Sequence, residues 1–221
     1  MKKTIFILCA MVVASFSFSQ MPDKFLKAME SKIAALDTTR TAEGFADLAN
    51  AFERIADAEK TQWLAYYYAA YCNASAGTMA GAGGDMMAAK ADKTDPYADK
   101  ADRQIKKAEE MMKNNSEIFV VKKMIATLRM LGDPMNRYMT YGPEAQAMLD
   151  EAKKLNPDNP RVYILEGQDK YFTPAEFGGS KDEAKALFEK AQKLYETFKP
   201  ETAIHPNWGK TQVAYFLSLY K

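Results

Sequence analysis

Apolar residues recur every three or four positions along almost the whole chain, and this spacing constrains the fold more than any other feature. The clearest run extends from Ala184 to Phe198, where one face is apolar and the opposite face is charged. Ser180 and Glu183 form a capping box there, in which each side chain satisfies a backbone donor of the first turn. Similar stripes occupy segments 26–36, 45–55, 101–112 and 145–155. The spacing predicts an all-α chain.

Two segments are apolar on most sides and are expected to form inner helices. They are Trp63–Cys72 and Ile118–Leu131. The pairs Asp95–Pro96 and Asn159–Pro160 each join a capping residue to a proline, which is typical of a helix start. No segment shows sustained alternation of apolar and polar residues, and no Asn-Gly or Asp-Gly hairpin signal occurs.

The first nineteen residues have the order of a secretory signal peptide. Lys2–Lys3 supply positive charge, Ile5–Phe18 is an apolar run, and Ser19 is a small residue at the expected cleavage position. The apolar run is too short to span a bilayer comfortably. We therefore expect export, with residues 20–221 forming one domain without a membrane span. The periplasm is the expected location, secretion is the alternative for the mature chain, and an uncleaved N-terminal anchor is the alternative for the leader.

The segment from Ala145 to Gly167 carries a specific series of residues. It holds a small–large–small triplet, a turn proline, a proline that opens the next helix, an aromatic residue and a glycine: Ala145, Leu149, Ala152, Pro157, Pro160, Tyr163 and Gly167. This series resembles the tetratricopeptide repeat family. Two further triplets have the same spacing without the proline: Ala101, Ile105, Ala108 and Ala184, Phe188, Ala191. Trp63 and Trp208 suit the aromatic position that opens a helix of such a repeat.

The resemblance covers residues 41–220 and implies a fold. It implies stacked antiparallel helix pairs, in a superhelix whose concave groove holds an extended peptide or protein segment. Two long insertions interrupt the expected repeats, one after Trp63 and one between Lys170 and Ser180. Independently of the family, helices with one apolar stripe must stack on their neighbours to bury it.

Tyrosines in the first inner segment are candidates for partner binding. Tyr67, Tyr68 and Tyr71 crowd one part of a helix, and each hydroxyl needs a partner if it is buried. One interpretation places some of these rings in the concave groove. The other places them between helix layers with their hydroxyls at the rim, and the sequence does not separate the two.

A glycine-rich insertion, Gly77–Lys90, is the second candidate. Four of the 11 glycines fall in its first part, which predicts a loop. Met79, Met86 and Met87 could give this loop apolar contact with a partner, as a lid or an arm. A plain solvent loop is the alternative. Phosphate binding is disfavoured because Met86 occupies the third glycine position, and thioether copper binding is disfavoured because no His or Cys stands nearby.

Composition excludes several classes of function. The net charge of +1 gives no basic excess for binding nucleic acid. A single His and two Cys leave no material for a zinc site, and Cys72, alone once the leader is removed, is expected to be buried. His205 is expected in a loop, and no nucleophile or carboxylate pair stands in a catalytic pattern. We expect no cofactor, no metal and no enzymatic activity.

Three functions remain, in order of preference. The first is an exported scaffold that binds a protein or peptide partner in the cell envelope through its concave groove. The second is a periplasmic small-ligand binding protein auxiliary to an uptake system, closed by the Gly77–Lys90 loop. The third is an enzyme of unrecognised type.

Overall fold

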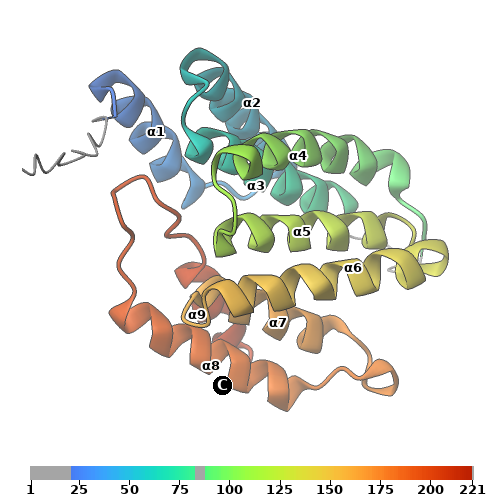
Figure 1. Ribbon diagram of the computed structural model, residues 1–221. Coiled ribbons are helices and arrows are strands. Elements are labelled where there is room, and N and C mark those ends of the chain that lie inside the picture. The colour runs from blue at the N-terminus through green and yellow to red at the C-terminus, as the bar shows by residue number, and fades with distance from the viewer. Residues whose placement is uncertain (1–20, 83–87, 221) are drawn as a thin grey trace, which may run out of the picture.

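The computed structural model describes residues 21–82 and 88–220, and these form a series of helices (Figure 1). In chain order the elements are α1 (Asp23–Leu36), α2 (Ala42–Glu59), α3 (Trp63–Gly81), α4 (Ala91–Met111), α5 (Ser116–Gly132), α6 (Pro134–Leu155), α7 (Pro160–Phe172), the short 3₁₀ turn η1 (Ala175–Phe177), α8 (Lys181–Thr197) and α9 (Lys210–Ser218). No strand occurs in these two ranges, so the all-α prediction is confirmed for them. None of the described helices combines the length and apolarity that a bilayer crossing requires. The predicted signal peptide lies outside the described residues.

Side-chain caps begin several of the helices where the sequence indicates. The Ser180 hydroxyl accepts the amide of Glu183 at the start of α8, and the Asn159 side chain accepts the amide of Arg161 at the start of α7. The expected start at Asp95–Pro96 is wrong. There α4 has already formed, because the amide of Thr94 donates to the carbonyl of Lys90 one turn earlier.

Helices that follow one another in sequence pack together. The most extensive contacts join α2 to α3, α3 to α4, α4 to α5, α5 to α6 and α7 to α8. In contrast, α6 and α7 touch little, although a four-residue turn joins them. The largest apolar cluster runs from α1 to α7, and two smaller clusters hold the last three helices. Figure 1 shows α6, α7, α8 and α9 grouped together below the earlier helices.

The two apolar segments form the inner helices, as predicted. All side chains from Trp63 to Ala74 on α3 are buried, and most of α5 is buried as well. The two helices also contact each other directly. A helix surrounded on most sides needs apolar residues all round, which explains why these segments lack a polar face.

The prediction of a loop over the whole of Gly77–Lys90 is wrong in its first part, because α3 continues to Gly81. A Cβ atom on Gly77 would lie 2.5 Å from a methyl carbon of Leu128 and 2.9 Å from the Cβ of Tyr97. The glycine therefore allows α3, α4 and α5 to approach closely. The absence of a side chain, and not the flexibility of a loop, explains why a glycine stands here.

The small residues of the Ala145–Gly167 series lie where helices approach. Ala145, Leu149 and Ala152 all face the interior of the molecule. A Cβ atom on Gly167 would lie 2.6 Å from the ring of Phe188, so this glycine lets α7 lie against α8. The residue pattern that carries the family resemblance thus corresponds to close packing between helices.

Candidate functional site

The tyrosines predicted to bind a partner lie inside the molecule. Tyr67, Tyr68 and Tyr71 are each at most 5% exposed. The ring of Tyr68 stacks on Phe52 of α2, with centroids 5.0 Å apart. Packing between helices is therefore the arrangement observed. A role in partner binding stays a prediction, and it would require these rings to become accessible.

An irregular segment between α8 and α9, residues 198–209, contacts two of these tyrosines, Tyr67 and Tyr71. Trp208 stacks on Tyr71 with centroids 4.6 Å apart, and its Nε1 donates a hydrogen bond of 2.9 Å to the hydroxyl of Tyr67. Ile204 is fully buried in the same segment. Trp208 was expected to open a helix, but α9 begins only at Lys210 because the segment turns inward first. The chain itself thus occupies the space beside α3.

A buried ion pair lies at the centre of this region. Nε of Arg161, at the start of α7, donates to both carboxylate oxygens of Glu117 at 3.0 and 2.8 Å. Asn159 donates to the same carboxylate at 2.7 Å, and the hydroxyl of Tyr67 donates to it at 3.1 Å. With Trp208, these residues form what we call the central network. It links α3, α5 and α7 to the 198–209 segment.

Burial and the Glu117 carboxylate together shift the pKa values of Arg161 and the nearby tyrosines. Burial alone would lower the pKa of Arg161, but the charge and hydrogen bonds of Glu117 raise it above its ordinary value. Burial raises the pKa of Tyr67 well above the usual phenol value, and the nearby carboxylate adds to the effect. Burial also raises the pKa of Tyr195 to about 12, although the Arg161 guanidinium opposes this. Arg161 therefore stays a cation, and the phenols of Tyr67 and Tyr195 near it stay neutral.

Only one of the three methionines of the glycine-rich insertion lies in the part of the chain that the structure describes. Met79 lies on α3 and is 37% exposed. Met86 and Met87 lie outside the described residues. Contact between these three side chains and a partner stays a prediction.

The remaining reactive side chains are held in place by packing. Cys72 is buried as predicted, and burial raises the pKa of its thiol well above the ordinary value. His205 lies in the 198–209 segment, where its ring packs edge-on to Trp63 and its Nε2 lies 3.2 Å from Glu201. Burial lowers the pKa of His205. No group of three or more His, Cys, Asp or Glu residues that could hold a metal occurs within 21–82 and 88–220.

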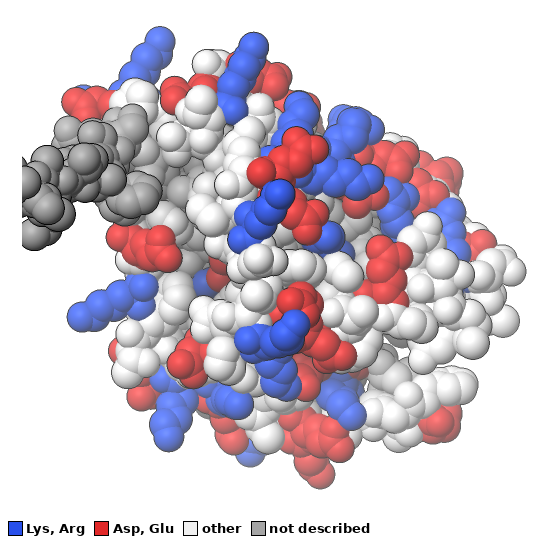
Figure 2. Space-filling model, viewed as in Figure 1, with Lys and Arg blue, Asp and Glu red and all other residues white. Residues whose placement is uncertain are grey.

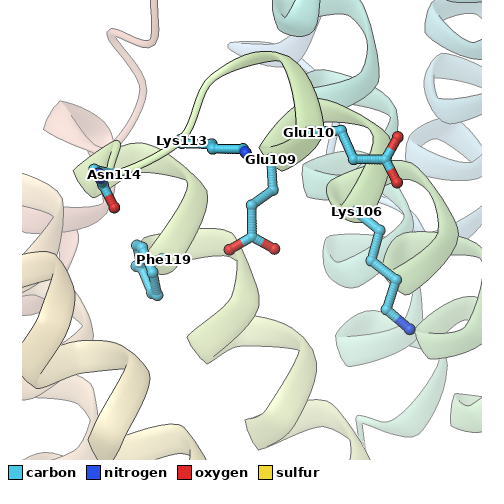
Figure 3. Close-up of a pocket in the computed structure, with 6 residues that line it drawn as sticks. All are labelled: Lys106, Glu109, Glu110, Lys113, Asn114 and Phe119. Atoms are coloured by element: carbon cyan, nitrogen blue, oxygen red, sulfur yellow. The ribbon is translucent and has the colours of Figure 1, made fainter.

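An open hollow of about 410 Å³ lies at the turn between α4 and α5 (Figure 3). Its walls are mostly charged or polar: Lys106, Glu109, Glu110, Lys113, Asn114 and Phe119. Glu109 is held by Lys122 at 2.9 Å. The volume suits a small ligand, but binding pockets for such ligands are usually lined by apolar side chains with a few polar groups. Five of the six residues that line this hollow are instead charged or polar.

Aromatic side chains gather where α7 ends and α9 ends. An inner layer consists of Tyr171, Phe216 and Tyr220, with Tyr171 centred 5.5 Å from Phe216 and 6.2 Å from Tyr220. Four apolar side chains in this part of the chain are 46–72% exposed: Phe172, Phe177, Tyr215 and Leu219. We call these seven residues the terminal aromatic face. Exposed apolar side chains that gather in one patch are a feature of interaction and ligand-binding sites.

A lysine lies against the terminal aromatic face. Nζ of Lys181, the first residue of α8, is 3.1 Å above the centre of the Tyr171 ring and donates to the Tyr171 carbonyl at 2.7 Å. Nζ of Lys185, one turn later, is 6.0 Å from the Tyr220 ring centre. Figure 1 shows the end of α7 and the start of α8 at the lower edge of the molecule. The face therefore combines flat apolar rings with positive charge.

A second apolar surface lies at the start of α6. Met135, Tyr138 and Met139 are 71%, 58% and 81% exposed, and we call them the α6 apolar surface. Figure 2 shows a charge-free region at the right edge, where α6 begins. The cation of this turn, Arg137, is held by Asp95 through two hydrogen bonds of 2.7 and 2.8 Å. The α6 apolar surface thus consists of two flexible methionines and one tyrosine ring, and the charge of the nearby Arg137 is paired with Asp95.

Comparison with solved structures finds a protein that is similar over nearly its whole length. The HusA haemophore from Porphyromonas gingivalis shares 35% sequence identity with this chain, at a TM-score of 0.77. The match covers 91% of this chain and 95% of the HusA chain. No protein-family model matches the chain, so the tetratricopeptide resemblance receives no support from that comparison. No curated protein matches it either.

Proposed function

Because the chain belongs to the family of the HusA haemophore, we propose that it binds haem or a closely related porphyrin as cargo. The single observation that carries the proposal is the similarity to a haemophore, at 35% identity along almost the whole of both chains. Exposed aromatic rings beside lysines add support, because a flat apolar ligand that carries carboxylates needs both.

This proposal corresponds to the small-ligand alternative, which we prefer to the peptide-binding groove. Tyr67, Tyr68 and Tyr71, which were candidates for the lining of such a groove, are buried, and Trp208 of the 198–209 segment packs on Tyr71. Packing between sequential helices supports a tetratricopeptide-like stacking as our interpretation of the architecture. We infer that this stacking serves as a scaffold for ligand binding and that the protein binds its ligand without catalysing a reaction.

The proposed location is outside the cytoplasm. The charge, apolar run and small residues of segment 1–19 support export, and a haemophore relative agrees with that. The periplasm is the first site that we propose and secretion the second.

Titration of the purified protein with haem tests the proposed function. Both tryptophans, Trp63 and Trp208, are buried in the described fold, so their fluorescence is a sensitive reporter of a bound chromophore. We expect saturable quenching of this fluorescence together with a shift of the haem absorbance band. An unchanged haem spectrum at protein excess would show that the ligand is of another class.

A further inference from the structure

We propose that the terminal aromatic face is the docking surface for the ligand, and that Lys181 binds one of its carboxylates. The inference rests on the proposed function, because a haem-class porphyrin is the occupant to which it commits. Such a ligand is a flat apolar ring system with two carboxylate side chains at one edge. A matching surface needs exposed flat rings and a cation at their border.

Exposure and ring packing favour this surface. Phe172 and Tyr215 come from α7 and α9 and are 56% and 61% exposed. Phe216 lies between them, 5.9 Å from Phe172 and 5.5 Å from Tyr215, so the three rings are continuous. Phe216 itself stacks on Phe188 with centroids 4.6 Å apart and an interplanar angle of 9°. The exposed rings therefore rest on a rigid aromatic layer and would lose little freedom when a ligand stacks on them.

The charge on Lys181 is available to a ligand. An ammonium group has three donors, and the Tyr171 carbonyl accepts one of them. No carboxylate of the described residues forms an ion pair with Lys181. The neighbouring glutamates have their own partners, since Glu183 pairs with Lys170 at 2.6 Å and Glu189 faces Lys185 at 3.8 Å. A carboxylate at the edge of the face would meet a cation that is already positioned.

Asp182 is the acidic residue that opposes this interaction. It follows Lys181 directly in the first turn of α8 and carries the opposite charge. A ligand carboxylate bound by Lys181 would therefore be repelled by Asp182. Removal of the Asp182 charge should tighten binding, whereas removal of the Lys181 charge should weaken it.

The α6 apolar surface is the rival surface and fits this ligand less well. Methionine side chains are flexible and offer no flat face, and Arg137 is already neutralised by Asp95. The charged hollow between α4 and α5 is also a poorer fit, because the lysines and glutamates that line it would have to lose hydration to hold an apolar ring.

Haem titration of matched variants tests the docking surface. The double variant Phe172→Ala/Tyr215→Ala should weaken haem binding about tenfold or more, because both stacking rings are removed. The double variant Met135→Ala/Met139→Ala is the control and should bind as the native protein does. All four side chains are largely exposed, so both variants should keep the native melting temperature.

The dimethyl ester of haem, in which both carboxylates are neutral, tests the role of Lys181. Lys181→Gln should weaken haem binding about three- to tenfold and leave binding of the ester unchanged, while Asp182→Asn should strengthen haem binding. If native protein binds haem and only the α6 variant weakens it, the terminal aromatic face is the wrong surface and the proposed function stands. If Lys181→Gln weakens haem and its ester equally, the carboxylate contact is wrong. If native protein binds no haem, the proposed function itself fails.

Discussion

Trp208 and Tyr67, which are 141 residues apart in the chain, share a hydrogen bond from the indole Nε1 to the phenol oxygen in the centre of the protein. The same indole stacks on Tyr71, and the backbone carbonyl of Trp208 accepts a hydrogen bond from the Tyr195 hydroxyl. One residue outside any helix therefore connects α3 with α8. The connection gives the first prediction.

Replacement of Trp208 should destabilise the whole protein. Trp208→Ala removes a buried stacking partner and a hydrogen bond, so we expect the free energy of unfolding to fall by about 3–5 kcal/mol. Urea denaturation followed by circular dichroism measures this change. Tyr138→Ala, at an exposed ring, is the control and should change it by no more than about 0.5 kcal/mol. Equal effects of the two variants would contradict the central position of Trp208.

Removal of the Glu117 charge should be costly because it leaves Arg161 buried without a counter-charge. Glu117→Gln should lower the free energy of unfolding by about 3–5 kcal/mol. Glu166→Gln breaks a partly exposed pair with Lys153 and should cost about 1 kcal/mol or less. Denaturation of the two variants side by side measures the difference. A similar small loss for both would mean that water reaches the Arg161 guanidinium.

Stability should decline at alkaline pH. An unfolded tyrosine ionises near pH 10, whereas burial raises the pKa of Tyr195 in the folded protein to about 12. Between about pH 10 and pH 12 the unfolded chain therefore loses its proton first, which favours unfolding. The stability that this phenol contributes is complete below about pH 10 and is lost as the pH rises towards 12. Tyr67 adds a change of the same sign, because burial raises its pKa as well.

Urea denaturation at several pH values across this window measures how steeply the free energy of unfolding falls with pH. Tyr195→Phe removes one of the titrating groups, so its stability should fall less steeply with pH, even though its absolute stability is lower. An identical slope in the variant and the native protein would show that Tyr195 ionises normally in the folded state.

A larger side chain at position 152 should disturb the contact between helices. Ala152 has no exposed surface, and its carbonyl accepts a hydrogen bond from Ser116 on α5. Ala152→Leu should therefore overpack this contact and lower the free energy of unfolding by about 1–3 kcal/mol. Ala147→Leu places the same side chain on the exposed side of α6 and is the matched control. A melting temperature equal to that of the control would refute the close approach.

The helices and the small-residue contacts could be predicted because they depend on neighbours in sequence. The stripe from Ala184 to Phe198 and the Ser180 cap specify α8 locally, and the structure has them as expected. The pair Asp95–Pro96 gave a wrong start for α4. A capping residue before a proline is a local signal, and here the helix already begins one turn earlier, at Ala91. Gly77 wrongly indicated a loop, because glycine also occurs where helices pack closely, as it does here.

The central network could not be predicted from local patterns. Glu117 and Arg161 are 44 residues apart, and no spacing rule relates them. The 198–209 segment did carry a signal, because Ile204 and Trp208 are large apolar residues in a stretch without helical spacing. Such residues in a loop indicate that the loop packs inward. The terminal aromatic face was missed because its residues come from the ends of separate helices and converge only in the folded chain.

The inward turn of the 198–209 segment also determines the order in which the molecule can fold. Helices such as α8 form from local contacts, which are quick to make. The contact of Trp208 with α3 joins residues that are 141 positions apart, and a contact of that sequence separation is slow because of the entropy of the intervening loop. We therefore expect the helices and the pairs of helices that are neighbours in sequence to assemble first. Trp208 should pack on α3 last. Until then Tyr67 and Tyr71 lack the cover of Trp208, so the half-folded chain, and not the finished protein, is the form most exposed to proteases and to aggregation.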